Sequence, residues 1–310
     1  MVTTSPPTTS PSTGGRLPLT PGRITALVIG VPICVALVAN AGFSLLAPFA
    51  EGSYPVRYAA PAAARSLTMH SAGGQLTVKP TTGDRLTLSG TAHYSFIKSS
   101  VTEQTTGGDT TVTYHCVTLP SGNCGLDATA FIPAGLPVTA STDGGNASVS
   151  DISAPVTLST GGGDLSADHI AKGPLSLSTD GGNVTASDIT APSFSASSGG
   201  GDIQASTVDS PAVTITTDGG NIQVTGVTTG KVSASTGGGD IYIAFATVPG
   251  NVHVTTSGGN ITLVLPRGNT MYNVNSHTGG NNSDGLSTST SSANVITATS
   301  GGGDITLRYA

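Results

Sequence analysis

Carboxylates recur along the second half of the chain at almost constant spacing, so they are the first candidates for chemistry. Asp164, Asp202 and Asp240 each close a [Ser/Thr]-Gly-Gly-Gly-Asp segment, and Asp304 closes the last one. On stacked coils, Asp164, Asp202 and Asp240 would lie two coils apart, at ~9.6 Å spacing. A Ca²⁺ ion needs its oxygen ligands at ~2.3–2.6 Å, so these carboxylates do not form one metal site. We expect them to be solvated turn residues.

Other residue types also lack the spacing of a catalytic or cofactor site. Glutamate occurs only at Glu51 and Glu103, and the six histidines are scattered. A phosphate-binding Gly-rich loop needs a following helix, and strand-like sequence follows here. We therefore expect a non-enzymatic domain with no catalytic, cofactor-binding or metal-binding residues. The alternative is a polysaccharide-acting enzyme on a β-helix, which a groove gathering three or more carboxylates with a His or Lys would favour.

The acidic turns alternate with a second form, and together they define a repeat. The sequence Thr-Asp-Gly-Gly-Asn ends at Asn146, Asn183 and Asn221, and looser versions end at Asn260 and Asn281. From Asn146 to Asp240, consecutive turns are 18 or 19 residues apart. A fixed period of this size is typical of a solenoid, in which each unit buries its apolar face against its neighbours.

Apolar residues recur within each unit at fixed offsets from the turn. After Asp164 they are Leu165, Ala167, Ile170, Leu175 and Leu177. Two pairs of these have the period of two that marks a half-buried strand. The sequence therefore predicts an all-β fold: a β-solenoid of ~19-residue coils, each with two strands and a Gly-Gly-Asn or Gly-Gly-Asp turn. A twisted antiparallel sandwich built from the same strands is the alternative.

The alternation of turns has an electrostatic rationale. Like carboxylates stacked one strand spacing apart repel each other, and alternating turns place an Asp in each column only on every second coil. Glycine accepts positive φ at little cost, so we expect that conformation at turn glycines such as Gly200 and Gly219.

Hydroxyl residues flank the second strand of each unit and should form two columns on a flat face. They are Thr157 and Ser159, Ser176 and Ser178, Ser195 and Ser197, Thr214 and Thr216, and Ser233 and Ser235. A solvated β-face is the plainest interpretation. Contact with carbohydrate is a sharper one, and contact with ice is disfavoured because Ser is mixed with Thr.

A long apolar segment precedes the repeats. Residues 24–50 carry no charge, which exceeds the ~20 residues that a membrane helix needs. Arg16 and Arg23 precede the segment, so the positive-inside rule places the repeats outside the cell. The predicted organisation is a disordered cytoplasmic tail at 1–23, a transmembrane helix at 24–47, a linker at 48–63, divergent N-terminal coils or a cap at 64–139, and solenoid repeats at 140–310.

Two cysteines lie outside the apolar segment. Cys116 and Cys124 flank the turn-forming sequence Pro-Ser-Gly-Asn. In an exported chain such a pair indicates a disulfide. A metal site using His115, Cys116 and Cys124 is the alternative, with His93 as the other nearby candidate ligand, but the usual second ligand pair is missing.

Several of these features together resemble a known family. They are the Arg57-Tyr58 start, the segment His93-Tyr94-Ser95-Phe96, Cys116 with Cys124, and the repeats from Ala140 to Tyr309. Over residues 55–310 the chain resembles the bacterial adhesin-like β-repeat proteins, a domain of unknown function, in their membrane-anchored actinobacterial form. The resemblance implies a protein of the cell membrane with a surface-exposed ectodomain. It implies neither a reaction nor a ligand.

Charge limits the possible partners. From residue 140 onward, Lys172, Lys231, Arg267 and Arg308 are set against twelve Asp. Nucleic acid binding needs clustered Lys and Arg, so we exclude it. The expected partners are the membrane, crossed once, and an envelope polymer or surface protein.

The end of the chain is a further point of interest. Ile305, Leu307 and Tyr309 alternate as in a first strand, and no second strand follows. We expect either an open solenoid edge here, available for pairing, or an edge covered by the insertion at residues 282–300.

We predict that the purified chain keeps its apolar segment. The alternative is a signal peptide cut after Ala39-Asn40-Ala41, an acceptable cleavage sequence. Intact mass and N-terminal sequencing should place the mature N-terminus before residue 24. A mature N-terminus at Gly42 would show that the segment is cleaved.

Overall fold

The computed structural model describes residues 32–33, 51–60, 64–116 and 124–310. The tail expected at 1–23 and nearly all of the transmembrane helix expected at 24–47 lie outside these ranges. Among the residues described, none forms a helix with the length and apolar character needed to cross a membrane.

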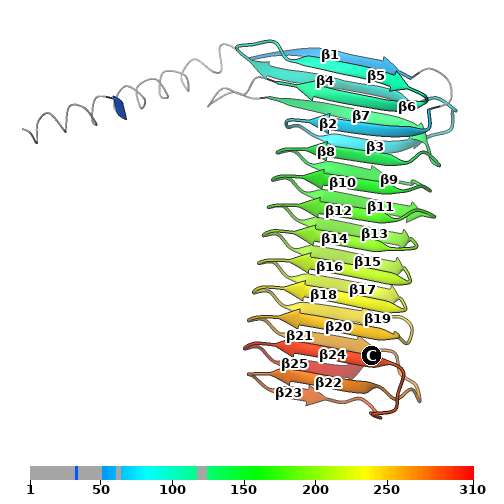
Figure 1. Ribbon diagram of the computed structural model, residues 1–310, viewed down its shortest axis with the longest axis vertical. Helices are drawn as coiled ribbons and strands as arrows, with labels where there is room; N and C mark the ends of the chain where they lie inside the picture. The colour runs from blue at the N-terminus through cyan, green and yellow to red at the C-terminus, as the bar shows by residue number, and fades with distance from the viewer. Residues whose placement is uncertain (1–31, 34–50, 61–63, 117–123) are drawn as a thin grey trace, which may run out of the picture. The chain divides into compact units, whose positions relative to one another are not determined.

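Residues 50–310 form one compact unit, a β-solenoid with two stacked sheets (Figure 1). In spatial order, the first sheet contains β1 (Glu51–Ala59), β4 (Thr87–Ser95), β7 (Gly125–Pro133), β3 (Leu76–Thr81), β9 (Ala147–Ser150), β11 (Leu165–Ala171), β13 (Val184–Thr190), β15 (Ile203–Asp209), β17 (Ile222–Thr228), β19 (Ile241–Phe245), β21 (Ile261–Leu265), β25 (Ile305–Tyr309) and β23 (Asn282–Asp284). We call it sheet A.

The second sheet, sheet B, contains in spatial order β22 (Asn273–Thr278), β24 (Val295–Ser300), β20 (Asn251–Thr256), β18 (Lys231–Thr236), β16 (Ala212–Thr217), β14 (Phe194–Ser198), β12 (Leu175–Thr179), β10 (Val156–Thr160), β8 (Val138–Thr142), β2 (Ser66–Ser71), β6 (Asp109–His115) and β5 (Ser100–Thr106). In the repeats, the Gly-rich turn leads from a sheet B strand to a sheet A strand. Neighbouring coils pair in parallel, residue to equivalent residue. The solenoid prediction is confirmed, and parallel pairing rules out the antiparallel sandwich for these repeats.

The core is a thin layer of aliphatic side chains between the two sheets. All five predicted apolar positions of the coil that follows Asp164 are at most 1 % exposed. Their equivalents on later coils, such as Val184, Ile203 and Ile222, are equally buried. Small β-forming residues suit such a layer, because each coil needs only to fill the space between two flat ladders.

Each turn is anchored to its neighbour by a buried hydroxyl. Thr179 at the end of β12 donates from Oγ1 to the carbonyl of Gly163 on the preceding coil, at 2.9 Å. The same oxygen accepts the N–H of Gly182 within its own turn, at 3.0 Å. Thr160, Ser198, Thr217, Thr236, Thr256 and Ser300 repeat this pair of bonds. The first residue of the turn motif therefore joins successive coils.

The close approach of coils dictates which glycines are required. A Cβ on Gly201 would lie 2.1 Å from the carbonyl oxygen of Gly182, and one on Gly220 would lie 2.0 Å from that of Gly201. At Gly200 and Gly219 the nearest atoms would be 3.9 and 3.8 Å away. Gly200 and Gly219 do not adopt positive φ, so that expectation was wrong. Glycine is needed one residue later in the turn, for closeness rather than for its dihedral angles.

The last residue of every turn belongs to a ladder that runs along the solenoid. Each side-chain Oδ1 accepts the backbone N–H of the next member at 2.6–2.9 Å. Three of the asparagines also donate from Nδ2 to the preceding Asp, at 3.1–3.3 Å. Asparagine thus separates one carboxylate from the next. In space the order is Asn146, Asp164, Asn183, Asp202, Asn221, Asp240, Asn260, Asp304 and Asn281.

The C-terminal strand does not form an open edge, so the first of the two expected alternatives is wrong; residues 282–284 of the insertion pair with it as β23. β25 pairs in parallel with β21 on one side and β23 on the other, and β24 lies likewise between β20 and β22. Figure 1 shows the red β24 and β25 between the gold and orange coils. After β21 the chain first builds the end coil from β22 and β23. It then runs back, and β24 and β25 insert between this end coil and the coil formed by β20 and β21.

A loop covers part of this end coil. Tyr272 is buried, and its backbone bonds to both Ser287 and Ser289. Tyr309 on β25 accepts the N–H of Ser287 at 3.1 Å. The part of the insertion around Ser287 and Ser289 therefore packs at the end of the stack, and the outermost strand of sheet A at this end, β23, has only three residues. A short edge strand is a poor template for pairing with another chain.

The N-terminal end closes the stack with antiparallel strands. β1 pairs with β4, β4 with β7, and β5 with β6, all antiparallel. β1 occupies residues that we had placed in the linker at 48–63, so the linker is shorter than expected. The region 64–139 supplies both a regular coil, β2 with β3, and this antiparallel end. Pro55 lies in the edge strand β1, where its missing N–H costs little.

Replacing Gly201 by Ala should destabilise the protein by about 1–3 kcal/mol, because the new methyl group collides with the neighbouring coil. Gly200→Ala is the matched control, with an expected change within about 0.5 kcal/mol. Urea unfolding monitored by circular dichroism measures both. Equal destabilisation of the two variants would contradict the close-approach explanation.

Candidate functional site

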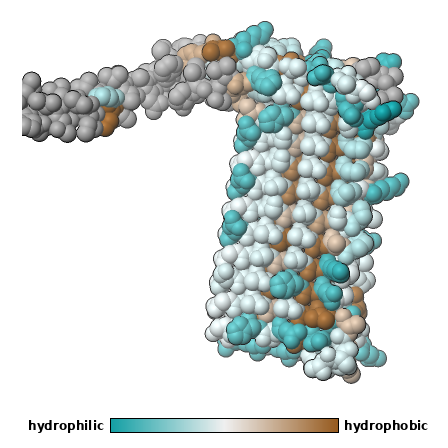
Figure 2. All heavy atoms as spheres, viewed as in Figure 1, coloured by the Kyte–Doolittle hydropathy of each residue, from teal (hydrophilic) through white to brown (hydrophobic). Residues whose placement is uncertain are grey.

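The outward face of sheet B carries the predicted hydroxyl columns. Thr157, Ser176, Ser195, Thr214 and Ser233 are in register on adjacent strands, and so are Ser159, Ser178, Ser197, Thr216 and Ser235. The columns continue through Thr139 and Ser141 on β8. Figure 2 shows pale columns of intermediate hydropathy alternating with brown apolar columns along the solenoid. We call these two columns, from β8 to β18, the hydroxyl face.

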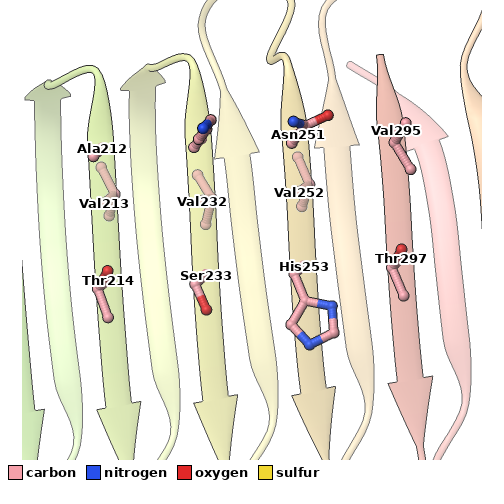
Figure 3. A pocket seen from close by; sticks show the side chains of 11 residues that line it. Ala212, Val213, Thr214, Val232, Ser233, Asn251, Val252, His253, Val295 and Thr297 are labelled. Carbon is pink, nitrogen blue, oxygen red and sulfur yellow. The ribbon is translucent and has the colours of Figure 1, made fainter. Parts of the chain in front are cut away.

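A shallow depression of about 560 Å³ interrupts this face near the C-terminal coils (Figure 3). It lies over β16, β18, β20 and β24. His253 occupies a position in the column that Ser233 and Thr297 occupy on the adjacent strands. Lys231 and Asn251 lie side by side at its rim. Lys231, Asn251 and His253 thus add a charged, an amide and an imidazole group to a lining that is otherwise made of Val, Ala, Ser and Thr.

A second regular feature lies on the sheet A side, five residues after each of the first five turns, from the Asn146 turn to the Asn221 turn. There the backbone adopts positive φ: Asp151 (58°), His169 (52°), Asp188 (52°), Thr207 (53°) and Gly226 (66°). The parallel ladder between β11 and β13 skips this position: Asp168 pairs with Ser187, and the next pair is Ile170 with Ile189. Asp and His are among the non-glycine residues that best tolerate this conformation. Side chains at this position on neighbouring coils are thus brought together at a bend.

This bend assembles the cluster Asp168, His169 and Asp188, whose potential ligand atoms all lie within 4.8 Å of one another. His169 Nδ1 is 2.7 Å from Asp168 Oδ2, and His169 Nε2 is 3.6 Å from Asp188 Oδ2. Ser187 on the adjacent strand donates a short hydrogen bond to Asp168 Oδ1. The three side chains are 43–58 % exposed. We call this the Asp-His-Asp cluster.

The electrostatics of the cluster follow from these contacts. The hydrogen bond and the charge of Asp168, helped by Asp188 and Asp151, raise the pKa of His169. Hydrogen bonds from Ser187 and His169 lower the pKa of Asp168. Each shift favours the charged form of its group, so the pair is an ion pair over a wider range of pH than isolated groups would be.

The sequence did not suggest this cluster. We expected no metal-binding residues, because the histidines are scattered along the chain. The available signal was positional: Asp151, His169 and Asp188 are each the fifth residue after a turn-closing Asn or Asp. The apolar offsets of the repeat do not include this polar position, so they give no indication of the cluster.

Ser187, Asp168 and His169 have the residue types of a hydrolase triad but not its connections. In a triad, the histidine accepts the serine proton and the aspartate orients the histidine. Here Ser187 donates to Asp168 instead, and His169 Nε2 faces Asp188. The serine is therefore not hydrogen-bonded to the histidine, which is its base in a triad.

The predicted turn residues and cysteines lie elsewhere. The turn carboxylates Asp164, Asp202 and Asp240 belong to the ladder, where each accepts a backbone N–H. Cys116 and Cys124 are joined in a disulfide with their Cα atoms 6.2 Å apart. This pairing leaves neither thiolate available as a metal ligand.

These features define a class of protein: a parallel β-solenoid with hydroxyl-anchored Gly turns and a flat polar face. The sequence profile of the Toastrack DUF4097 family matches residues 56–308, and the chain belongs to that family. This agrees with the resemblance seen in the sequence, because that family too is a domain of unknown function.

Comparison with other proteins gives distant similarities. No match was found among curated protein sequences. Similar solved structures include a candidate cell adhesion protein from Clostridium sporogenes, with 12 % identity over 84 % of this chain and 100 % of that chain, and a TM-score of 0.28. A candidate adhesin from Bacteroides fragilis has 11 % identity over 83 % and 97 %, with a TM-score of 0.40. A candidate lipid binding protein from Parabacteroides distasonis has 10 % identity over 85 % and 98 %, with a TM-score of 0.48.

We predict that His169 titrates above the usual histidine pKa of ~6.5, and that Asp168→Asn moves its midpoint back toward that value. Because the folded-state pKa is raised, the protonated pair stabilises the fold below the ordinary histidine pKa. That contribution is lost as the pH rises through the raised pKa. NMR titration of the imidazole carbons measures the midpoint. Asp180→Asn, which removes a turn carboxylate from the same coil as Asp188, should leave it unchanged.

Proposed function

We propose that residues 51–310 are a non-catalytic, extracytoplasmic binding module, tethered by a single membrane-spanning segment at 24–47. Its contact surface is the hydroxyl face of sheet B. The observation that carries this proposal is the in-register stacking of outward Ser and Thr side chains over consecutive strands from β8 to β18. The anchoring part rests on the uncharged sequence of residues 24–50.

The chemistry of the face suits an extended, uncharged polymer. Each hydroxyl can both donate and accept a hydrogen bond, as the hydroxyls of a glycan do. Ser197 Oγ already donates to Ser178 Oγ at 3.0 Å, so these two neighbouring strands, β14 and β12, present a linked pair of hydroxyls. The hydroxyls recur at the strand spacing along the solenoid axis. A polymer of repeating units can therefore make a similar contact with several strands in turn. A polysaccharide of the cell envelope is therefore the favoured partner, ahead of a surface protein.

The alternative of a polysaccharide-acting enzyme meets only part of its condition. The Asp-His-Asp cluster does gather carboxylates with a histidine, and Asp151 adds a further negative charge nearby. The cluster is exposed at a bend on the sheet A side, and none of its members lines the depression in sheet B. We therefore assign the hydroxyl face a binding role.

The test is a pull-down of cell-wall polysaccharide and surface-protein fractions by the immobilised full chain. Thr214→Arg and Ser233→Arg each place a long charged side chain on the hydroxyl face and should weaken capture of the polysaccharide at least about tenfold. Thr185→Arg is the matched control, because Thr185 is equally exposed on β13 of sheet A. Capture that survives both sheet B variants would contradict the assigned face. Capture of protein alone would favour the surface-protein partner.

A further inference from the structure

We propose that His169 and Asp188 are the protein ligands of a site for a first-row transition metal ion, with Asp168 orienting the histidine. The site lies at the bend between neighbouring coils on the sheet A side. It is separate from the hydroxyl face and does not depend on the function proposed for that face.

The orientation of His169 is the first step of the argument. An ionised Asp168 can only accept, so Nδ1 of His169 carries the proton in their 2.7 Å hydrogen bond. In the neutral imidazole, the lone pair available to a metal is then on Nε2. This is the arrangement in which a metal-bound histidine donates its other N–H to a carboxylate. Ser187 holds that carboxylate from the adjacent strand.

The distance across the site is the second step. His169 Nε2 and Asp188 Oδ2 are 3.6 Å apart. Two ligands bound to one zinc ion at ~2.1 Å and at a tetrahedral angle lie ~3.4 Å apart. A shift of a few tenths of an ångström in two exposed side chains therefore brings both atoms to bonding distance. The pair needs no rearrangement of the backbone.

Charge and access are the third step. Asp151 occupies the same bend position on the preceding coil and contributes negative charge near His169. Both proposed ligands are about half exposed, so an ion can reach them and its remaining coordination positions are open to water or to another molecule. An imidazole with a carboxylate suits Zn²⁺, Cu²⁺ or Ni²⁺, whereas Mg²⁺ and Ca²⁺ prefer oxygen ligands alone.

Titration of the full chain in mild detergent with ZnCl₂, followed by isothermal calorimetry, tests the site. We expect saturable binding that His169→Ala and Asp188→Asn each weaken at least about tenfold, as loss of a ligand requires. Asp168→Asn should weaken binding about 10- to 100-fold while leaving both ligands in place. MgCl₂ should give no comparable binding.

Two variants serve as matched controls. His93→Ala removes a histidine whose Nε2 lies 3.2 Å from Asp127, so it tests whether any His–Asp pair would suffice. Asp180→Asn removes the same charge as Asp188→Asn from an exposed turn position on the same coil. Both should bind Zn²⁺ like the unmodified chain. Circular dichroism of every variant checks that the solenoid is intact.

Absence of saturable Zn²⁺ binding would overturn the proposal, and so would unchanged affinity in His169→Ala. Equal losses in Asp180→Asn and Asp188→Asn would overturn it as well, because the effect would then be one of net charge.

Discussion

The distance between successive coils at the Gly-rich turn constrains the rest of the structure. The buried hydroxyl of each turn donates to a glycine carbonyl of the preceding coil, and the next glycines must then pass so close that a Cβ would overlap a backbone oxygen. Once the turn is held at this separation, the strands on either side are in register and the apolar positions of consecutive coils face one another. The hydrophobic core is the consequence of this spacing as much as its cause, because small aliphatic residues alone would not select one register.

The alternation of Asn and Asp is a property of neighbours in space rather than in sequence. Along the chain the pattern fails at its end, where Asn260 is followed by Asn281 and then Asp304. In the structure Asp304 lies between the two asparagines, and the ladder of side-chain acceptors is unbroken. Two carboxylates are thus never adjacent in the column from Asn146 to Asn281. The spatial order of the coils therefore keeps the alternation of Asn and Asp that the order along the chain does not.

Much of the fold could be predicted from the sequence, because its period and its apolar offsets are local properties of each repeat. The positions of the residues with positive φ could not be predicted in this way. Glycines concentrate in the turn, where closeness requires them, while the left-handed conformation occurs at Asp151, His169 and Asp188, whose residue types tolerate it. The reordered C-terminal coils depend on which strands pair, and that is not a local property. The two consecutive asparagine turns were the visible sign of it. The same reason explains why the Asp-His-Asp cluster was missed, since its members are adjacent only after the coils have stacked.

The placement of β24 and β25 has a consequence for how the protein is completed. In a solenoid built in chain order, the terminal coil can fray while the coils behind it stay paired. Here β22 pairs with β24 and β23 pairs with β25, so the end coil is attached to the stack through strands that come after it in the sequence. The segment from Asn273 to Asp284 therefore takes its place in the stack only when β24 and β25 have paired with it. Strands β24 and β25 thus form an interior layer that joins the end coil to the rest of the stack.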